Sequence, residues 1–205
     1  MDDRIRTRKS EIRKGMKRLL REYLSGQDAE TRSRTGEALA SKVCALETWK
    51  EADYVCCFLS MPDEIETGPL IDRAMQEHKS VFVPRIEGDD ISFVALDKGW
   101  RGWERDAWNI PVPPAHLEAV GPLFFLESRT LFLVPGLAFD GFNRRLGRGK
   151  GYYDRYIAGM DENVRASRQT EYRMPTLVGI GLVFQVVPEV PADEHDRILD
   201  SVITV

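Results

Sequence analysis

The chain contains short runs of consecutive apolar residues, separated by segments with the periodicity of amphipathic helices. Residues 53–59 read DYVCCFL and residues 130–134 read TLFLV. Neighbouring residues of a strand point to opposite faces of its sheet, so an uninterrupted apolar run requires a sheet that is covered on both faces. Because such strands alternate with helical segments along the chain, the pattern predicts an α/β fold. We expect a three-layer, mostly parallel sheet flanked by helices, in a Rossmann-like arrangement.

The periodicity of the other segments predicts the remaining elements. Helices are expected over residues 9–24, 29–47, 67–78 and 151–160. Further strands are expected over residues 81–83, 91–96, 177–180 and 201–205, and a loop over 97–122. Asp28 is the expected N-cap of the second helix, and Pro69 lies in the first turn of the third, where its missing N–H does no harm. In such a sheet a ligand binds beyond the carboxyl ends of the strands, to which the strand at 130–134 delivers the following segment.

The composition indicates one domain without a membrane segment. With 205 residues, 42% hydrophobic and 30% charged, the chain is expected to form a single α/β domain over residues 1–205 with an N-terminal helical arm. The net charge of −4 argues against a dedicated nucleic-acid-binding protein, although residues 1–21 hold nine Lys or Arg and three acids. The three cysteines are expected to be reduced, and no signal sequence or long apolar run is seen, so a cytoplasmic location is expected. Nothing demands an oligomer, so we expect a monomer.

Residues 145–154, which read RLGRGKGYYD, alternate glycines with cations. Glycine tolerates positive φ angles, so successive N–H groups can face a bound anion. The residues that follow should begin a helix, whose N-terminus favours phosphate, and Asp154 suggests an accompanying divalent cation. The segment matches neither the Walker A pattern nor G-x-G-x-x-G, and for the glycines alone a flexible turn is the competing interpretation.

Four motifs carry a resemblance to a known family. They are residues 9–13 (KSEIR), 59–67 (LSMPDEIET), 108–111 (WNIP) and 135–156, which contains PGLAFD and the glycine-rich segment. In this order they resemble the 5-formyltetrahydrofolate cyclo-ligase family, also called methenyltetrahydrofolate synthetases. Ile12 replaces the family's Leu, and Asn143 stands where the family usually has Gly. Asn tolerates the left-handed backbone conformation better than most residues, so the turn is expected to survive.

The resemblance implies conversion of 5-formyltetrahydrofolate to 5,10-methenyltetrahydrofolate, with ATP as co-substrate and Mg²⁺ as metal. The formyl oxygen would take the γ-phosphoryl group, giving an imino phosphate, and N10 would then close the ring and expel phosphate. The protein's part in such a reaction is positioning and charge neutralisation. The folate, polyglutamylated or not, ends in anionic glutamate, which the basic N-terminal arm is expected to help hold.

The resemblance also implies which residues form the site. The implied ATP-binding residues are Lys9, Arg13, Arg145, Leu146, Gly147, Arg148, Gly149, Lys150, Gly151, Tyr152 and Tyr153. The implied folate-binding residues are Leu59, Met61, Glu64, Trp108, Arg148 and Tyr152. The implied catalytic residues are Arg148, Lys150 and Tyr152, and the implied metal ligands are Asp154 and Asp196. His195, beside the second aspartate, is expected to be a surface residue.

Each of these residue types has an ordinary alternative. Lys9 and Arg13 lie four apart on one helical face and can reach the same phosphate tail, but such pairs also occur as solvated basic faces. Glu64 follows a strand end and can accept hydrogen bonds from pterin N–H groups, or be a simple loop acid. Two other functions stay open at this point. One is a non-catalytic nucleotide- or RNA-binding protein, and the other is a related ligase or kinase with a different acceptor.

Overall fold

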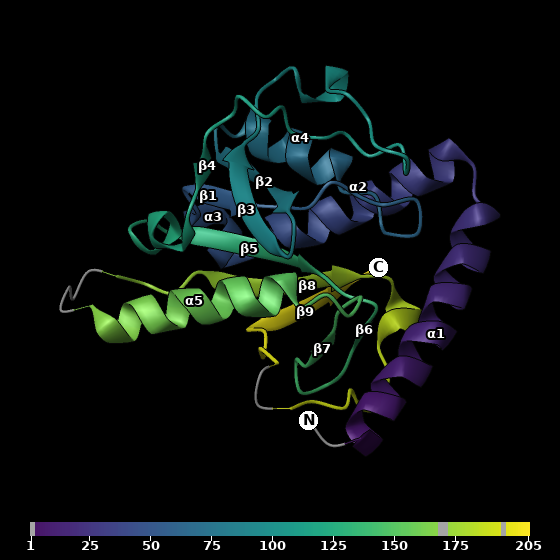
Figure 1. Cartoon of the computed structure of the whole chain (residues 1–205). Helices are drawn as coiled ribbons and strands as arrows, with labels where there is room; N and C mark the ends of the chain where they lie inside the picture. Colours follow the sequence, from purple (N-terminus) through teal and green to yellow (C-terminus); the bar gives the residue numbers. More distant parts are fainter. Residues whose placement is uncertain (1–2, 168–171, 194–195) are drawn as a thin grey trace.

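A seven-stranded sheet forms the centre of the protein in a computed structural model that describes residues 3–167, 172–193 and 196–205 (Figure 1). Its spatial order is β4 (Ala119–Val120), β3 (Asp90–Ala95), β2 (Ser80–Glu87), β1 (Tyr54–Cys56), β5 (Thr130–Pro135), β8 (Thr176–Gly181) and β9 (Ser201–Thr204). The five strands from β2 to β9 run parallel, whereas β3 and β4 are antiparallel additions at one edge. The predicted mostly parallel α/β sheet is therefore confirmed.

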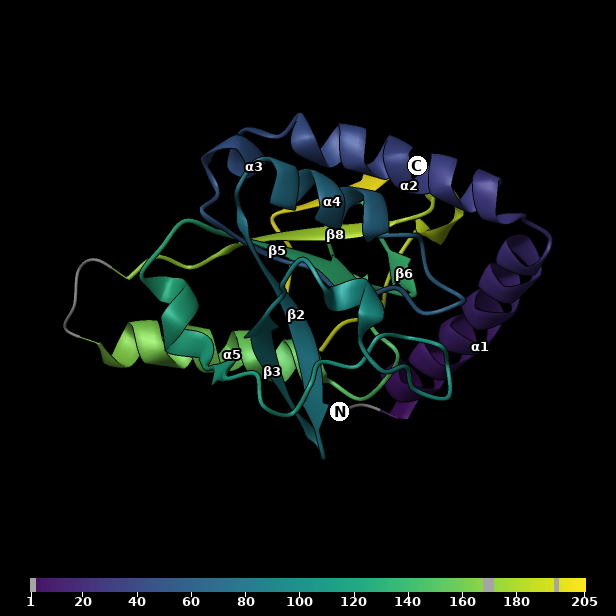
Figure 2. The ribbon, with the colours of Figure 1, turned by 90° about the horizontal axis from the view of Figure 1, so that it is seen from above.

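Helices cover both faces of this sheet. They are α1 (Asp3–Ser25), α2 (Ala29–Cys44), α3 (Glu47–Glu51), α4 (Gly68–Gln76) and α5 (Tyr152–Ala166). Helices α2, α3 and α4 lie on one face and α5 on the other, while α1 runs along the end of the molecule beside β6 (Figures 1 and 2). Short 3₁₀ turns occur at Trp100–Gly102, Pro122–Leu126 and Val183–Gln185. Within the described residues, no helix has both the length and the apolar character needed to cross a membrane.

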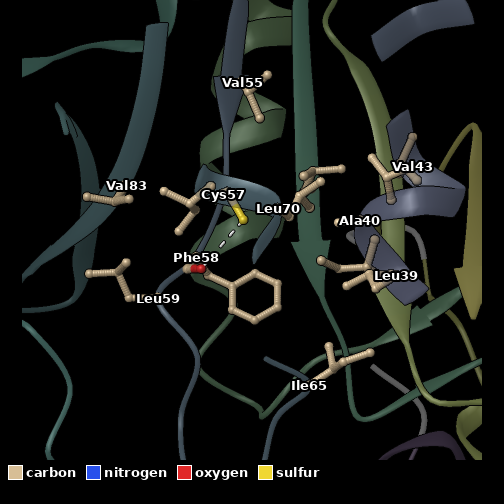
Figure 3. Packing of buried hydrophobic residues seen from close by; sticks show 14 of the residues in the cluster. Leu39, Ala40, Val43, Val55, Cys57, Phe58, Leu59, Ile65, Leu70 and Val83 are labelled. Carbon is tan, nitrogen blue, oxygen red and sulfur yellow. Dashed lines mark hydrogen bonds between the residues drawn. The ribbon is translucent and has the colours of Figure 1, made fainter. Parts of the chain in front are cut away.

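Residues that alternate along the strands enter two separate hydrophobic clusters. Val55 and Leu133 pack with Leu39 of α2 in the first cluster. Cys56 and Phe132, their neighbours in sequence, pack in the second cluster, which includes residues of α5. Figure 3 shows the first cluster, in which side chains of α2 and α4 approach β1 and the residues after it. Since both faces are buried, the apolar runs of β1 and β5 need no polar alternation.

The structure corrects several predicted boundaries. The helix predicted over 29–47 ends at Cys44, and α3 begins at Glu47. Only residues 54–56 of the predicted strand 53–59 pair as strand, although residues 57–59 remain buried. Helix α5 continues to Ala166, six residues beyond its predicted end at 160. Strands β2 and β3 form an antiparallel hairpin, a relationship that their apolar pattern does not reveal.

The predicted glycine-rich loop is partly a strand. Arg145–Leu146 forms β7, which pairs antiparallel with β6 (Ala138–Phe139) in a second, two-stranded sheet. Asn143 lies in the turn between them with φ 59°, so it adopts the left-handed conformation expected for it. Its side-chain amide donates to the Asp200 carbonyl (3.1 Å), and its own carbonyl accepts from the Leu199 N–H (3.0 Å).

The strand order locates the crevice of the fold. From β1 the chain continues to β2 on one side and later to β5 on the other, so the order reverses between β1 and β5. At such a reversal the loops leaving two adjacent parallel strands diverge and leave a crevice at their carboxyl ends. The segments leaving these two strands are residues 57–67 and 136–151, which contain the second sequence motif and most of the fourth.

Candidate functional site

A cleft of about 1030 Å³ lies at this crevice, and it is called the central cleft below. The predicted site residues that line it are Lys9, Arg13, Leu59, Met61, Glu64, Trp108, Arg145, Gly147, Arg148, Gly149, Lys150, Gly151, Tyr152, Tyr153, Asp154 and Asp196. Leu146 is different, because its side chain is 1% exposed and belongs to the hydrophobic core. His195 lies outside the described residues. Helix α1, the loop after β1 and the loop after β5 thus converge on one cavity.

Helix α1 contributes a buried cation to the cleft. The Lys9 Nζ donates to Asp193 Oδ2 at 2.9 Å and to Asp196 Oδ2 at 2.5 Å, and the lysine side chain is 4% exposed. Burial by itself lowers the pKa of Lys9, but the hydrogen bonds and charges of the two aspartates outweigh it and raise the pKa. Lys9 therefore stays charged and ties the N-terminal helix to the segment before β9.

Asp154, the other acid predicted to bind metal, is also held by a cation. Arg145 Nη2 donates to both carboxylate oxygens of Asp154, at 2.9 and 2.8 Å, and its Nη1 donates to the Pro135 carbonyl at 3.0 Å. The Arg145 side chain is 4% exposed, so it is a buried support of the loop. In the structure its guanidinium orients the first turn of α5, and its predicted contact with phosphate stays a prediction.

The glycine-rich segment has the backbone geometry of an anion cradle. Gly149 has φ 104° and Gly151 has φ 69°, so both occupy a region that favours glycine. Gly151 is the N-cap of α5 and makes no side-chain capping bond. No described residue accepts a hydrogen bond from the N–H groups of residues 148–151. Free N–H groups at the start of a helix are the arrangement that binds phosphate.

Two cations beside this cradle lack an acidic partner among the described residues. Arg13 Nε donates to the Gly147 carbonyl at 2.9 Å, which fixes the guanidinium against the loop. Lys150 is exposed and forms no ion pair with any residue that the structure describes. Arg155 is a third cation of the cleft without a carboxylate partner among the described residues, since it donates to backbone carbonyls. The remaining cations of the cleft pair with carboxylates, so these three provide the positive charge that is left for a bound anion.

Arg148 joins the two loops of the cleft. Its Nη2 and Nη1 donate to the two carboxylate oxygens of Asp63, at 2.7 and 3.1 Å, and its Nε donates to Glu64 Oε1 at 3.0 Å. The other Glu64 oxygen accepts from the Met61 N–H at 3.1 Å. Burial raises the pKa of Glu64, although the charge of Arg148 opposes the shift. Arg148 was predicted to contact both ATP and the folate, and in the structure it lies between the glycine-rich segment and Glu64.

The predicted ring-binding residues lie around Glu64 at the same side. Leu59 and Met61 follow β1, and Trp108, which is 62% exposed, belongs to a loop held by Asp106. The Asp106 carboxylate accepts from the Trp108 N–H at 2.8 Å and from the Ile110 N–H at 3.0 Å. An exposed indole beside an apolar wall is suited to stacking on an aromatic ligand.

Tyr152 connects the start of α5 to the β2–β3 turn. Its hydroxyl donates to the Gly88 carbonyl at 3.2 Å, and Arg155 lies over its ring at 5.6 Å. Arg155 also donates to the carbonyls of Asp89 and Lys150. Tyr152 therefore lines the cleft with its hydroxyl bonded to the β2–β3 turn.

The carboxylates fit a Mg²⁺ ion that is held mainly by phosphate. Asp154 and Asp196 are one-fifth to one-quarter exposed and line the cleft near the cradle. A carboxylate that accepts from one cation keeps further lone pairs for a metal. The described residues contain no cluster of three or more metal-binding side chains. Mg²⁺ commonly uses one or two carboxylates together with substrate phosphates, which matches this donor set.

The motif-based prediction missed several residues of the site. Asp63 precedes Glu64 and was given no role, Asp193 lies in the same acidic run as Asp196, and Arg155 lies one residue after the predicted metal ligand. The only indication of their role in the sequence was that they lie within a few positions of predicted site residues. Their partners, Arg148, Lys9 and the β2–β3 turn, are far away in sequence, so no local pattern indicates the contacts.

Comparisons with known proteins identify the same family as the four sequence motifs. The profile of the 5-formyltetrahydrofolate cyclo-ligase family matches residues 5–205. The 5-formyltetrahydrofolate cyclo-ligase of Mus musculus is 30% identical over 93% of this chain and 92% of its own length. The probable cyclo-ligase of Schizosaccharomyces pombe is 32% identical over 82% of each chain. The structure of Aquifex aeolicus 5,10-methenyltetrahydrofolate synthetase has a TM-score of 0.71 and 28% identity, and covers 96% of this chain and 89% of that one.

Proposed function

The chain belongs to the 5-formyltetrahydrofolate cyclo-ligase family, and we propose that its central cleft couples phosphoryl transfer from ATP to closure of the folate ring. The protein converts 5-formyltetrahydrofolate to 5,10-methenyltetrahydrofolate, as the family and its named relatives indicate. The proposal concerns how this conversion is driven, which residues carry it, and what else the cleft must bind.

The formyl oxygen is a poor leaving group, so it needs activation before the ring can close. In the proposed reaction the formyl oxygen attacks the γ-phosphorus, the bond from that phosphorus to the bridging oxygen breaks, and ADP leaves. N10 then attacks the formyl carbon and loses its proton, while the carbon–oxygen bond breaks and inorganic phosphate departs. The protein must align two ligands and neutralise the phosphates, which is positioning and electrostatic work.

The main support for a nucleotide site is that free backbone N–H groups and cations without carboxylate partners lie side by side. The N–H groups of residues 148–151 have no acceptor among the described residues, and Lys150 and Arg13 flank them. Lysine offers a compact charge to phosphate, and an arginine can bind two of its oxygens at once. Asp154 and Asp196 would hold Mg²⁺, which when bound supplies charge neutralisation of the phosphates.

The opposite side of the cleft is suited to the folate. Glu64 presents a mostly buried carboxylate beside Met61 and Leu59. The N–H groups of a pterin can donate hydrogen bonds to such a carboxylate. Arg148 touches both Glu64 and the start of the cradle, so it lies where the formyl group and the γ-phosphate would meet. We assign it, with Lys150 and Tyr152, to the reacting centre.

A spectroscopic assay tests the proposal directly. The absorbance of methenyltetrahydrofolate should rise when the protein is mixed with MgATP and 5-formyltetrahydrofolate, and it should not rise when either ATP or Mg²⁺ is omitted. Lys150→Ala should raise KM for ATP, whereas Glu64→Ala should raise KM for the folate. A natively folded protein without turnover refutes the proposed function. Unchanged kinetics in both variants refute the residue assignment.

RNA binding is the competing function, and the basic residues of α1 are the feature that favours it. RNA binding through several phosphates falls steeply as salt rises, whereas saturation by a single nucleotide depends on salt less strongly. The cleft favours small molecules, because cations and apolar walls lie within one cavity. We therefore propose no nucleic-acid partner, a monomeric state and a cytoplasmic location, which sedimentation and cell fractionation can test.

A further inference from the structure

A second, smaller pocket of about 380 Å³ adjoins the folate side of the central cleft. It lies among the start of α2, residues 59–62 after β1, the start of α4 and residues 100–111. It shares Leu59, Met61, Trp108 and Pro111 with the central cleft, so the two cavities have a common wall. We call this cavity the arginine pocket, after Arg32, Arg101 and Arg105, which line it.

The charges of the arginine pocket favour an anion. Glu66 is the one acid among its lining residues within the described chain, against three guanidinium groups. Arg105 donates to the Asn109 carbonyl at 2.7 Å, and Arg32 to the Pro62 carbonyl at 2.9 Å, so neither has a carboxylate partner among the described residues. Arg101 pairs with Asp72 at 2.6 Å and lies over the Trp100 ring at 4.4 Å.

An unsatisfied donor in the wall provides a second, independent indication. The indole N–H of Trp100, one of the residues that line the pocket, is buried and has no acceptor among the described residues. Buried donors without partners are uncommon, and each calls for an explanation such as a missing ligand or water. The first turn of α4 also borders the cavity through Gly68, and a helix N-terminus carries positive potential. The wall therefore combines three guanidinium groups with a helix N-terminus.

We propose that the arginine pocket binds the glutamate carboxylates of the folate substrate. This inference rests on the proposed function, because the pterin must lie at Glu64 for the other end of the substrate to reach the shared wall. A folate carries its aromatic ring system at one end and a dicarboxylate at the other. Trp108 and Met61 would hold the intervening ring, and Arg101 and Arg105 would each bind carboxylate oxygens in the forked geometry of guanidinium groups. The glutamate would thus lie beside the starts of α2 and α4.

Titration calorimetry without ATP tests this assignment separately from catalysis. The probes are 5-formyltetrahydrofolate and 5-formyltetrahydropteroate, which lacks only the glutamate. The wild-type protein should bind the first about tenfold more tightly, the order expected from partly exposed charge-assisted hydrogen bonds. Arg101→Gln combined with Arg105→Gln should remove most of this preference and leave affinity for the pteroate within about twofold, as for other distant exposed substitutions. Arg18→Gln combined with Arg34→Gln, two exposed changes outside both cavities, is the control of equal charge for the double variant.

Several outcomes overturn the assignment. Equal affinities of the two probes for the wild-type protein would show that the glutamate binds nowhere. An equal loss for both probes in the double variant would show that Arg105 only supports the Trp108 loop. Binding of free L-glutamate as tight as that of the folate would identify a separate dicarboxylate site. If the glutamate preference is found and no turnover follows with MgATP, the pocket is supported and the proposed reaction is refuted.

Discussion

The contact that joins the two loops of the cleft gives a quantitative prediction. Asp63→Asn removes a carboxylate that accepts two hydrogen bonds from Arg148, at 2.7 and 3.1 Å, with both side chains about one-quarter exposed. Hydrogen bonds to charged groups contribute about 1.5–3 kcal/mol and exposed ion pairs at most about 1 kcal/mol, so a partly buried pair should contribute about 1.5 kcal/mol. For a chain of this length the variant should unfold about 3–6 °C lower.

Arg148→Met should destabilise the protein more than Asp63→Asn does, for a different reason. It removes the same pair and also leaves the mostly buried carboxylate of Glu64 without its cation. Leaving one partner of a buried pair uncompensated costs about 3 kcal/mol or more, so the Tm should fall about twice as far. Burial already raises the pKa of Glu64, and removing the cation raises this pKa further.

The pH dependence separates the two variants. A carboxyl whose pKa is raised on folding contributes stability at low pH that is lost as the pH rises through its folded pKa. The penalty of Arg148→Met should therefore grow as the pH rises from about 4.5, the ordinary pKa of a glutamate, through the raised pKa of Glu64 in the folded variant. Asp63→Asn removes a negative charge near Glu64, which lowers the pKa of this residue, so its penalty should not grow. Denaturant unfolding across this range measures both penalties. Equal losses, or a penalty for Arg148→Met that is independent of pH, would refute the reasoning.

Three further predictions concern the loops and the thiols. Gly149→Ala, at φ 104°, should raise KM for ATP and cost about 1–2 kcal/mol of stability, whereas Gly159→Ala in α5 has space for its Cβ and is the stability control. Asn143→Gly should keep kcat and KM within about twofold, because the position already has a positive φ, whereas Asn143→Val should cost about 2 kcal/mol in a denaturation curve. Burial raises the pKa of Cys57 to about 12 and that of Cys44 to about 11, so Ellman's reagent at pH 8 should label Cys57 only after unfolding. Rapid labelling of Cys57 in the folded protein would contradict its burial.

Local sequence patterns predicted the features that depend on neighbouring residues alone. The sheet follows from the apolar runs at β1 and β5, because a strand buried on both faces needs no polar alternation. The helix start at Asp28 follows from a single side chain, which accepts the Thr31 N–H at 2.8 Å as predicted. The left-handed Asn143 is another local property that the residue type anticipated.

The sequence by itself determined the family, the α/β sheet and about half of the residues that line the cleft, because motifs and hydrophobic periodicity are local or ordered along the chain. The tertiary structure alone decided which charges neutralise one another. Arg148 meets Asp63 across 85 positions and Lys9 meets Asp193 across 184, and only folding brings such pairs together. It likewise decided that Arg145 supports Asp154, that Leu146 is buried, and that three arginines surround a second pocket beside the cleft. Long-range pairing depends on the path of the whole chain, which no local pattern contains.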